Sequence, residues 1–341
     1  MLSQRAETIL KSIVGRYIVG AVPVASETIA HEHELSVSPA TIRNEMARLE
    51  QNGYITRDYP SAGSVPSDKG YRFYVETLND LELPLAEQFL INHLFHQVEM
   101  EQEKWLSLAA TLLARLARNA AIVATPKPVD GRFKYLELVA LQDSLVLVIL
   151  ILRGARVKQQ LTTFGQVVSQ PELISITNKL NAAYSGLTRR KILEKTIELL
   201  PNEQQITDCV VKIMQDDDER EFEESYFDGL HFVLNQPEFA QSHQMLDLME
   251  LIEHRNLLKI ITPQGRSSQG VQVVIGKENK AEIIQNYSVV ISQYGLPEEA
   301  VGTISVVGPT RMPYARIIST VGYLSSVLTA LLAELYGIEK S

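Results

Sequence analysis

A helix with well-defined ends, close to the N-terminus, constrains this 341-residue chain more than any other feature. Ser38 stands where it can accept a backbone N–H as N-cap, and Pro39 follows at the first helical position, where its missing N–H costs nothing. At about 100° per residue, Ile42, Met46 and Leu49 then fall within one narrow sector. The pattern predicts a short amphipathic helix that begins after Ser38 and buries one stripe.

The opposite face of this helix is small and polar near its N-terminal end. A helix that enters the major groove of DNA needs small residues for close approach, hydrogen-bonding side chains for base edges and Arg side chains for phosphates. On this basis the candidate DNA-binding residues of the helix are Ser38, Ala40, Thr41, Arg43, Asn44 and Arg48. Spacing alone favours a plain solvated face instead, so the neighbouring elements decide between the two.

The elements on either side of the helix favour a winged helix. Two helices are predicted before it, over residues 3–19 and 27–33, and Gly53 can end the third helix in the left-handed conformation. A short β-prone segment at 54–57 is followed by a turn-rich loop at 59–66 that leads into another extended piece. Helix, helix, helix, strand, loop, strand is the order of a winged helix, in which the third helix reads DNA and the loop is the wing.

The net charge has to be counted separately for the predicted DNA-binding segment and for the rest of the chain. The net charge of −9 disfavours non-specific attraction to phosphates, but residues 1–79 carry eight basic and nine acidic side chains, so −1 lies there and −8 elsewhere. Basic groups from the predicted third helix to the following helix can form a local stripe. The wing and its flank therefore add the candidate contacts Arg57, Ser61, Gly63, Ser64, Lys69 and Arg72.

The rest of the chain predicts a sheet domain with an insertion. A long amphipathic helix is expected over residues 85–120 and a closing helix from Pro313. Short polar or glycine-containing links join three predicted strands into an antiparallel meander, at 135–141, 145–152 and 156–163. Three further strands are predicted near the other end of the chain, at 271–275, 287–294 and 302–307. The intervening segment, 171–261, is mostly helical in pattern.

Motifs for enzyme chemistry are missing from the sequence. The segment Gly276-Lys277-Glu278 lacks the other residues of a phosphate-binding P-loop, and neither a G-x-S-x-G nor an H-E-x-x-H motif occurs. His93, His96 and Glu99 recur at helical spacing, but no Cys lies nearby and no fourth ligand is indicated, so we expect no metal. The sequence predicts neither an enzyme nor a cofactor.

One further segment joins a predicted strand to the start of the closing helix. Backbone N–H groups at that helix start, together with Thr310 and Arg311, can hold an anion. The alternative, which we favour, is a structural cap in which Arg311 pairs with a carboxylate. Sequence alone identifies no ligand for this segment.

The compartment follows from cysteine usage and from the apolar runs. Cys209 has no intramolecular partner, which fits a reducing compartment. Charged residues interrupt the apolar side chains of the first twenty positions, so no secretory signal is visible. The most apolar run, 145–152, is far shorter than the roughly 20 residues of a membrane helix. We therefore expect a cytoplasmic protein without membrane contact.

Five segments resemble the HrcA family of heat-inducible transcription repressors. In chain order they are PVAS at 23–26, VSPATIRNEMARLEQNGYI at 37–55, SAGSVPSDKGYRFYV at 61–75, NQPEF at 235–239 and VVGPTRMPYARII at 306–318. They span nearly the whole chain in the right order. Two positions depart from the family pattern, because Ser64 stands where Arg is usual after Ser-Ala-Gly and Ala25 where Gly is frequent.

The resemblance implies an α+β multidomain fold. It comprises a winged helix-turn-helix domain at 1–79, a discontinuous GAF-like α/β sheet domain at 85–165 and 262–341, and an inserted, mostly helical dimerisation domain at 166–261. It also implies a homodimer that represses transcription of heat-shock (chaperone) operons by binding an inverted-repeat operator in double-stranded DNA. The resemblance further implies that heat shock releases this repressor and that a GroEL-type chaperonin maintains its active form. Ser64 puts one expected wing contact with DNA in question.

Two other functions stay open on the sequence alone. A metabolite bound by the GAF-like domain would make the chain a metabolite-sensing transcription regulator, and a near-neutral first domain is compatible with a protein-interaction scaffold that binds no DNA. Heat release is expected as a stability effect, because modest heating inactivates a marginally stable domain. The strand at 145–152, once exposed, is a segment that aggregates or binds a chaperonin.

Overall fold

The chain forms two compact units of mixed helix and antiparallel sheet. The computed structural model describes residues 2–30, 38–57, 59, 62–79, 81–98, 101–128, 131–142, 144–153, 156–219, 225–239, 270–297 and 299–336. The first unit holds residues 1–125, 224–294 and 302–331. The second unit holds residues 126–223, 295–301 and 332–341.

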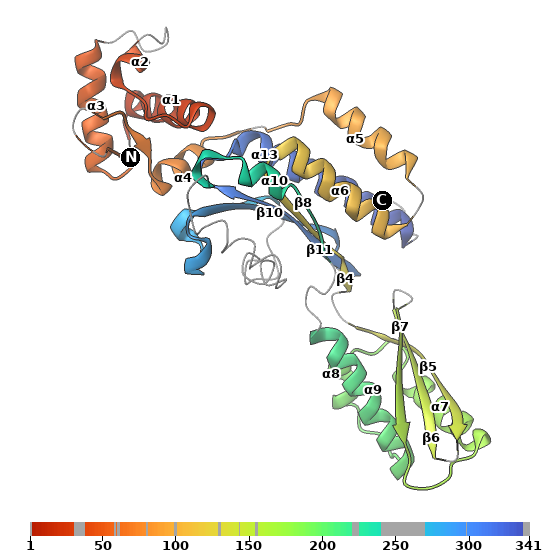
Figure 1. Cartoon of the computed structure of the whole chain (residues 1–341). Coiled ribbons are helices and arrows are strands. Elements are labelled where there is room, and N and C mark those ends of the chain that lie inside the picture. Colours follow the sequence, from red (N-terminus) through yellow and green to blue (C-terminus); the bar gives the residue numbers. More distant parts are fainter. Residues whose placement is uncertain are drawn as a thin grey trace. The chain divides into compact units, whose positions relative to one another are not determined.

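The first unit opens with a small head, which we define as residues 2–79. Its elements are α1 (Gln4–Gly20), α2 (Ser26–Ala30), α3 (Pro39–Gln51), β1 (Ile55–Thr56), β2 (Val65–Pro66) and α4 (Asp68–Glu76). The two short strands pair antiparallel, with Ile55 opposite Pro66. This order of elements agrees with the prediction (Figure 1). Gly53, just beyond α3, is left-handed at φ 75°.

Buried aliphatic side chains hold the head together. The apolar stripe of α1 is buried, and α3 buries Ile42, Met46 and Leu49 as its spacing predicts. Ile29 of α2 is buried as well. Because full burial of such a side chain contributes roughly 1.5–3 kcal/mol, these contacts are the main source of stability for so small a segment.

The body of the first unit, its described residues from 81 onward, is built on an antiparallel sheet. The strand order is β8-β3-β11-β10-β9. Strand β4 pairs with the first residues of β11, and these paired residues fall in the second unit. The strands are β3 (Ala120–Ala124), β4 (Lys127–Pro128), β8 (Ser225–Asp228), β9 (Gln272–Ile275), β10 (Tyr287–Leu296) and β11 (Ala300–Pro309). Figure 1 shows α6 (Gln102–Ala117) and α13 (Tyr314–Leu335) over one face of this sheet.

Shorter elements complete the body. They are α5 (Leu85–Gln97), α10 (Leu230–Leu234) and the 3-10 turns η1 (Pro237–Phe239), η2 (Gly276–Glu278) and η3 (Glu282–Ile284). Arg316 ties three helices together, because its side chain donates to the Leu116 carbonyl at 2.9 Å and to Glu87 Oε1 at 2.9 Å. The turns η2 and η3 follow β9 directly.

The predicted single helix over 85–120 is wrong, because the segment forms α5, α6 and β3. Val98 and Glu101 have extended backbones, which breaks the helix between them. The two helices also differ in burial, since α5 buries only Ile91 and Phe95 whereas α6 buries a full stripe around Trp105. Strand β3 is buried along its whole length, so it lacks the alternation that marks a half-buried strand.

The second unit packs three helices on one face of a three-stranded sheet. Its strands β5 (Phe133–Gln142), β6 (Leu145–Leu152) and β7 (Arg156–Thr163) form the predicted antiparallel meander. The helices are α7 (Gln170–Tyr184), α8 (Arg189–Glu194) and α9 (Pro201–Glu219). One core cluster joins the inward side chains of the strands, such as Val148, to Leu180 of α7 and Val210 of α9.

The domain division differs from the expected one. Residues 135–163 were expected with the sheet domain, but they lie in the second unit together with α7 to α9. The reason is pairing and packing: among the described strands these three pair only with one another, and their inner face is covered by the helices that follow them. Strand β8, within the segment expected to be helical, instead extends the sheet of the first unit through β3.

One helix of the described chain, α13, is long and apolar enough to cross a membrane by length and composition alone. A core helix of a globular protein meets the same criterion. The buried side chains of α13 include Ile317, Val321, Leu324 and Leu328, at helical spacing. This spacing is that of a helix with one face in a protein core.

Candidate nucleic-acid interface

The N-terminal end of α3 is held by the residues predicted to cap it. Ser38 is extended, at φ −66° and ψ 150°, and its Oγ accepts the Thr41 N–H at 3.2 Å. The same Oγ lies 3.0 Å from Thr41 Oγ1. At the other end, Asn52 Nδ2 donates to the Arg48 carbonyl at 2.7 Å. Both ends of α3 are therefore fixed by side chains of the head itself.

The outer face of α3 is free to meet a ligand. Of the six candidate residues on the helix, Thr41 is half-buried and the others are exposed: Ser38, Ala40, Arg43, Asn44 and Arg48. Arg48 is 72% exposed and forms an i, i+3 pair with Glu45 at 3.4 Å. Within the described part of the chain, the side chains of Arg43 and Asn44 have no hydrogen-bond or ion-pair partner. Their side chains are available for hydrogen bonds to another molecule.

The base of the loop between β1 and β2 is fastened to the turn after α1. Val24 and Ser64 exchange backbone hydrogen bonds of 2.9 and 2.8 Å, and Ser64 is fully buried. Arg57 Nε donates to Ser64 Oγ at 3.1 Å, and its side chain is only 13% exposed. Both residues, predicted as DNA contacts, point into the head. Ser61, predicted with them, lies outside the described residues.

Gly63 occupies a place that no larger residue fits. A Cβ at this position would lie 2.5 Å from the carbonyl group of Pro23, which is a steric overlap with backbone. Gly63 is half-buried and borders Ser64 at the base of the loop. Its role in this structure is close packing of the loop against the preceding turn.

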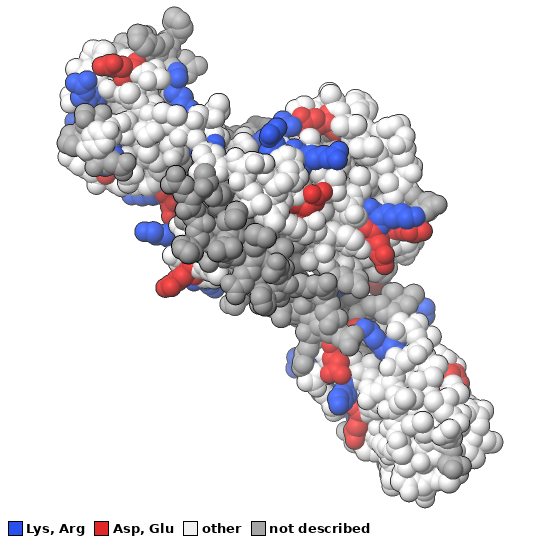
Figure 2. All heavy atoms as spheres, in the orientation of Figure 1, with Lys and Arg blue, Asp and Glu red and all other residues white. Residues whose placement is uncertain are grey.

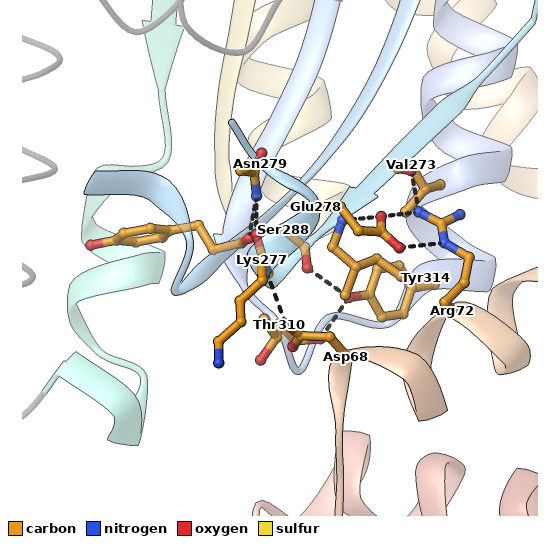
Figure 3. Close-up of polar contacts among 12 residues, drawn as sticks. Asp68, Arg72, Val273, Lys277, Glu278, Asn279, Ser288, Thr310 and Tyr314 are labelled. Carbon is orange, nitrogen blue, oxygen red and sulfur yellow. Dashed lines mark hydrogen bonds and ion pairs between the residues drawn. The ribbon is translucent and has the colours of Figure 1, made fainter. Parts of the chain in front are cut away.

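The two basic residues predicted on α4 also have partners within the first unit. Lys69 Nζ donates to the Asn52 carbonyl at 2.9 Å, beyond the C-terminus of α3, and lies 4.4 Å from the Tyr54 ring centroid. Arg72 turns toward the body, where its Nε donates to Glu278 Oε1 at 2.8 Å and its Nη2 to the Val273 carbonyl at 2.6 Å (Figure 3). Lys69 remains exposed, whereas Arg72 is half-buried.

Thr310 and Arg311, the predicted anion site or structural cap, form hydrogen bonds with other groups of the protein. Arg311 Nε donates to Glu238 Oε1 at 2.6 Å, and its Nη1 donates to the Ile18 carbonyl at 2.7 Å. The Thr310 carbonyl accepts the Tyr314 hydroxyl at 2.6 Å. The Arg311 side chain is 13% exposed, so its charge is satisfied by a carboxylate and by the end of α1.

The charge on the face shown in Figure 2 is mixed. Lys and Arg side chains lie in separate small patches, with Asp and Glu patches among them and no continuous basic field. This agrees with the near-neutral composition of residues 1–79. The described residues on this face therefore offer no broad basic surface to phosphates.

Three residues that sequence reasoning missed link the head to the body. Asp68 accepts a hydrogen bond from the Lys277 N–H at 2.9 Å, and Glu278 accepts one from the Arg72 side chain. Gly276 has no Cβ and so leaves space for the Asp68 carboxylate. Asp68 and Arg72 lie in a segment that resembles a family motif, but nothing in their spacing points to partners about two hundred residues away. Among the described residues no cluster of His, Cys, Asp and Glu is arranged to hold a metal, and Glu99 lies outside them.

Comparison with known proteins identifies relatives over the full length of the chain. A family model described as the HrcA protein C terminal domain matches residues 103–318. A protein of Dehalococcoides mccartyi named heat-inducible transcription repressor HrcA is 54% identical over 99% of this chain and 98% of its own length. Proteins of the same name from Roseiflexus castenholzii and Chloroflexus aggregans are 41% and 37% identical, each over 99% of this chain and 96% and 95% of their own lengths.

One solved structure shares the fold. It is titled as the crystal structure of a hypothetical protein at 2.2 Å resolution, and it superimposes with a TM-score of 0.61 over 98% of this chain and 99% of its own. The sequences are 22% identical, so this likeness concerns the fold alone. It supports the mixed α and β architecture described above.

Proposed function

The chain belongs to the HrcA family of heat-inducible transcription repressors, and we propose that it binds as a homodimer to an inverted-repeat operator and represses heat-shock operons. Two-fold symmetry in the protein matches an inverted repeat in DNA, because one recognition helix reads one half-site. A bacterial repressor of this kind acts where the DNA is, in the cytoplasm. The proposal assigns no chemistry to the chain beyond binding.

The observation that carries the proposal is the unoccupied polar face of α3. Its small Ala40 allows close approach to the groove floor, and Asn44 offers the amide that pairs with adenine in two hydrogen bonds. Arg43 and Arg48 flank this amide and suit phosphates or guanine. Because Ile42, Met46 and Leu49 are buried on the opposite side, the helix is held rigidly while this face stays open.

We assign the head as a winged helix, with α3 as recognition helix and the loop between β1 and β2 as wing. Arg57 and Ser64 support the wing from inside, since Ser64 is buried, Arg57 is half-buried and the two are hydrogen-bonded to each other. Tyr59, in the wing and 61% exposed, is better placed than either to meet the DNA backbone. Lys69 supports the end of α3.

An exposed apolar face on the second unit supports the homodimer. Two cross-strand rows lie outside the core, formed by Tyr135, Ile151 and Val157 and by Val139, Leu147 and Leu161. Tyr135, Val157 and Leu161 are 44%, 53% and 55% exposed. The row between them holds Glu137, Ile149 and Gln159, so the face combines exposed apolar side chains with two polar ones. Exposed apolar rows on a sheet face suit a protein interface, and a second copy offers a matching face. We therefore assign the second unit as the inserted dimerisation domain and the sheet of the first unit as the GAF-like domain.

Heat sensitivity and chaperonin dependence fit the same unit. Strand β6 is the sequence LVLVILIL, whose even-numbered residues are buried in the core while its odd-numbered residues are half-buried on the outer face. Local opening on heating would expose both faces of this strand, which creates a segment prone to aggregation. A chaperonin that binds such segments would return the repressor to its folded, active form.

The proposed function is tested by a gel shift with an operator selected from random duplex DNA and a scrambled duplex of the same composition. Asn44→Ala is expected to lose about 1–3 kcal/mol of discrimination between the two, because one base-specific pair is removed. Asn92→Ala, on the exposed face of α5, serves as the matched control. Equal discrimination by the wild-type chain and Asn44→Ala would exclude α3 as the reading helix.

A further inference from the structure

Helix α4 of the head forms hydrogen bonds with a single turn of the body, η2 (Gly276–Glu278). Helix α4 presents Asp68 and Arg72 to the turn that follows β9 (Figure 3). Asp68 Oδ2 accepts the Lys277 N–H at 2.9 Å, and Arg72 forms a two-point pair with Glu278 while also donating to the Val273 carbonyl. Glu278 in turn accepts the Ile275 N–H at 2.8 Å. The charged groups of Asp68 and Arg72 in the head therefore each have a hydrogen-bond partner in the body.

The turn is shaped for this contact. Gly276 is left-handed, at φ 51°, and a Cβ there would collide with the Asp68 carboxylate. Buried Asn279 holds the turn from behind, because its Nδ2 donates to the carbonyls of Gly276 and Tyr287 at 2.8 and 2.9 Å. The shape of the turn is thus set by the body and is complementary to α4.

A second contact fixes the head at another point. Arg311 lies between Glu238 of the body and the Ile18 carbonyl, which is one of the last carbonyls of α1 and has no partner within that helix. Tyr71 of α4 lies between the two contacts, 2% exposed, with its ring centroid 5.9 Å from that of Tyr314. Because α1 and α4 contact the body at two separate points, rotation of the head about either contact would break the other.

These contacts leave the recognition face uncovered. Residues of the joint belong to α4, the end of α1 and the body, whereas Arg43, Asn44 and Arg48 on α3 are exposed. The joint therefore does not block DNA binding. A joint that orients the head without covering α3 suits a dimer that must present two recognition helices at a fixed separation.

We propose that the joint formed by Asp68, Arg72, Gly276, Glu278 and Arg311 is a positioning device that sets each head for simultaneous binding of both operator halves. The proposal rests on the proposed function, a dimer on an inverted repeat. With the joint closed, binding of one half-site places the second head close to its own half-site. With the joint open, the head is tethered by residues 77–84, and the second binding step loses effective concentration.

The test uses the double variant Glu278→Gln/Gly276→Ala in the full-length chain. Both changes lie in the body, so neither removes a DNA contact, and Glu282→Gln on an exposed position of the neighbouring turn is the control. Affinity is measured for the selected operator and for a duplex that contains one half-site. Amide hydrogen exchange at Lys277 reports whether the joint is open, since this N–H is donated to Asp68.

The proposal expects faster exchange at Lys277, a loss of at least about 10-fold in affinity for the full operator and unchanged affinity for the half-site. Faster exchange with unchanged affinity for the full operator would overturn it. So would an equal loss on both duplexes, which would mean that the head itself is damaged, or unchanged exchange, which would mean that the joint does not form in solution. A wild-type chain that binds neither duplex would instead refute the proposed function.

Discussion

Arg57 donates a hydrogen bond of 3.1 Å to the buried hydroxyl of Ser64, and this contact ties the first strand of the head to the base of its loop. Arg57 also lies 3.4 Å from Glu50 of α3. One guanidinium, directly after β1, thus contacts both the base of the loop and α3. Among the described residues, Arg57 Nη2 is buried and has no hydrogen-bond partner.

The Arg57–Ser64 contact predicts that Ser64→Ala destabilises the head. Removal of the hydroxyl takes away one acceptor of Arg57 Nε and leaves Glu50 Oε2 at 3.4 Å, a loss that costs about 0.5–1.5 kcal/mol. Urea unfolding followed by a probe in the head measures this change. Ser107→Ala, on an exposed face of α6, controls for the general effect of the substitution. Equal stability of the two variants would show that the contact contributes nothing.

Arg48→Ala is expected to weaken DNA binding to all sequences alike. Its side chain is exposed at the C-terminal end of α3, where it suits a phosphate and carries no sequence information. Loss of one phosphate contact lowers the slope of log K against log salt by about 0.9 per site. Titrations at several salt concentrations measure the slope, with Arg190→Ala as a control that removes another exposed Arg from an intrahelical pair. A slope identical to that of the wild-type chain would rule out the phosphate contact.

The Arg72–Glu278 pair predicts a pH-dependent joint. Burial raises the pKa of Glu278, but hydrogen bonds from Arg72 and the Ile275 N–H and the charge of Arg72 outweigh it, so the pKa lies below its ordinary value. A depressed pKa means that the pair stabilises the fold above the unfolded pKa of Glu, about 4.3, and that this stabilisation is lost as the pH falls through the folded pKa. The stability difference between the wild-type chain and Glu278→Gln should therefore shrink below about pH 4.3. A difference that stays constant from neutral pH to pH 3 would contradict the assignment.

The outer face of the second sheet predicts the site of dimerisation. Leu161→Asp places a charge in a row with Leu147 and Val139 and should convert the dimer to monomers. Leu193→Asp is the matched control, because Leu193 lies on α8 of the same unit and is 62% exposed against 55% for Leu161. Light scattering coupled to size-exclusion chromatography gives the masses. A dimeric Leu161→Asp variant would place the interface elsewhere.

Local signals in the sequence predicted the elements that are determined locally. The Ser38–Pro39 pair begins α3 as expected, and the short polar or glycine-containing links place β5, β6 and β7 in the predicted meander. Strand β3 was missed because a strand buried on both faces has no alternation, and its neighbour β8 is only four residues long. The helix at 85–120 was predicted as one element because apolar spacing continues across a break that the backbone makes at 98–101.

The polar partners of basic residues could not be predicted from the sequence. Arg72 and Glu278 are separated by 206 positions, and Arg311 and Ile18 by 293, so no spacing rule relates them. The burial of Ser64 could not be predicted either. Serine is common in exposed loops, but this one is fully buried. The candidate contacts on α3 were easier, because helical periodicity assigns each residue of a short amphipathic helix to one side.

The most direct test of the account is a selection of binding sites by the purified full-length chain from a random duplex library. If the chain is a dimeric repressor that reads DNA through α3, the enriched sequences will contain one motif twice, in inverted orientation and at constant spacing. The same selection with Asn44→Ala should lose preference at corresponding positions in both halves. Enrichment of no sequence, or of a single motif without its inverted copy, would contradict the account.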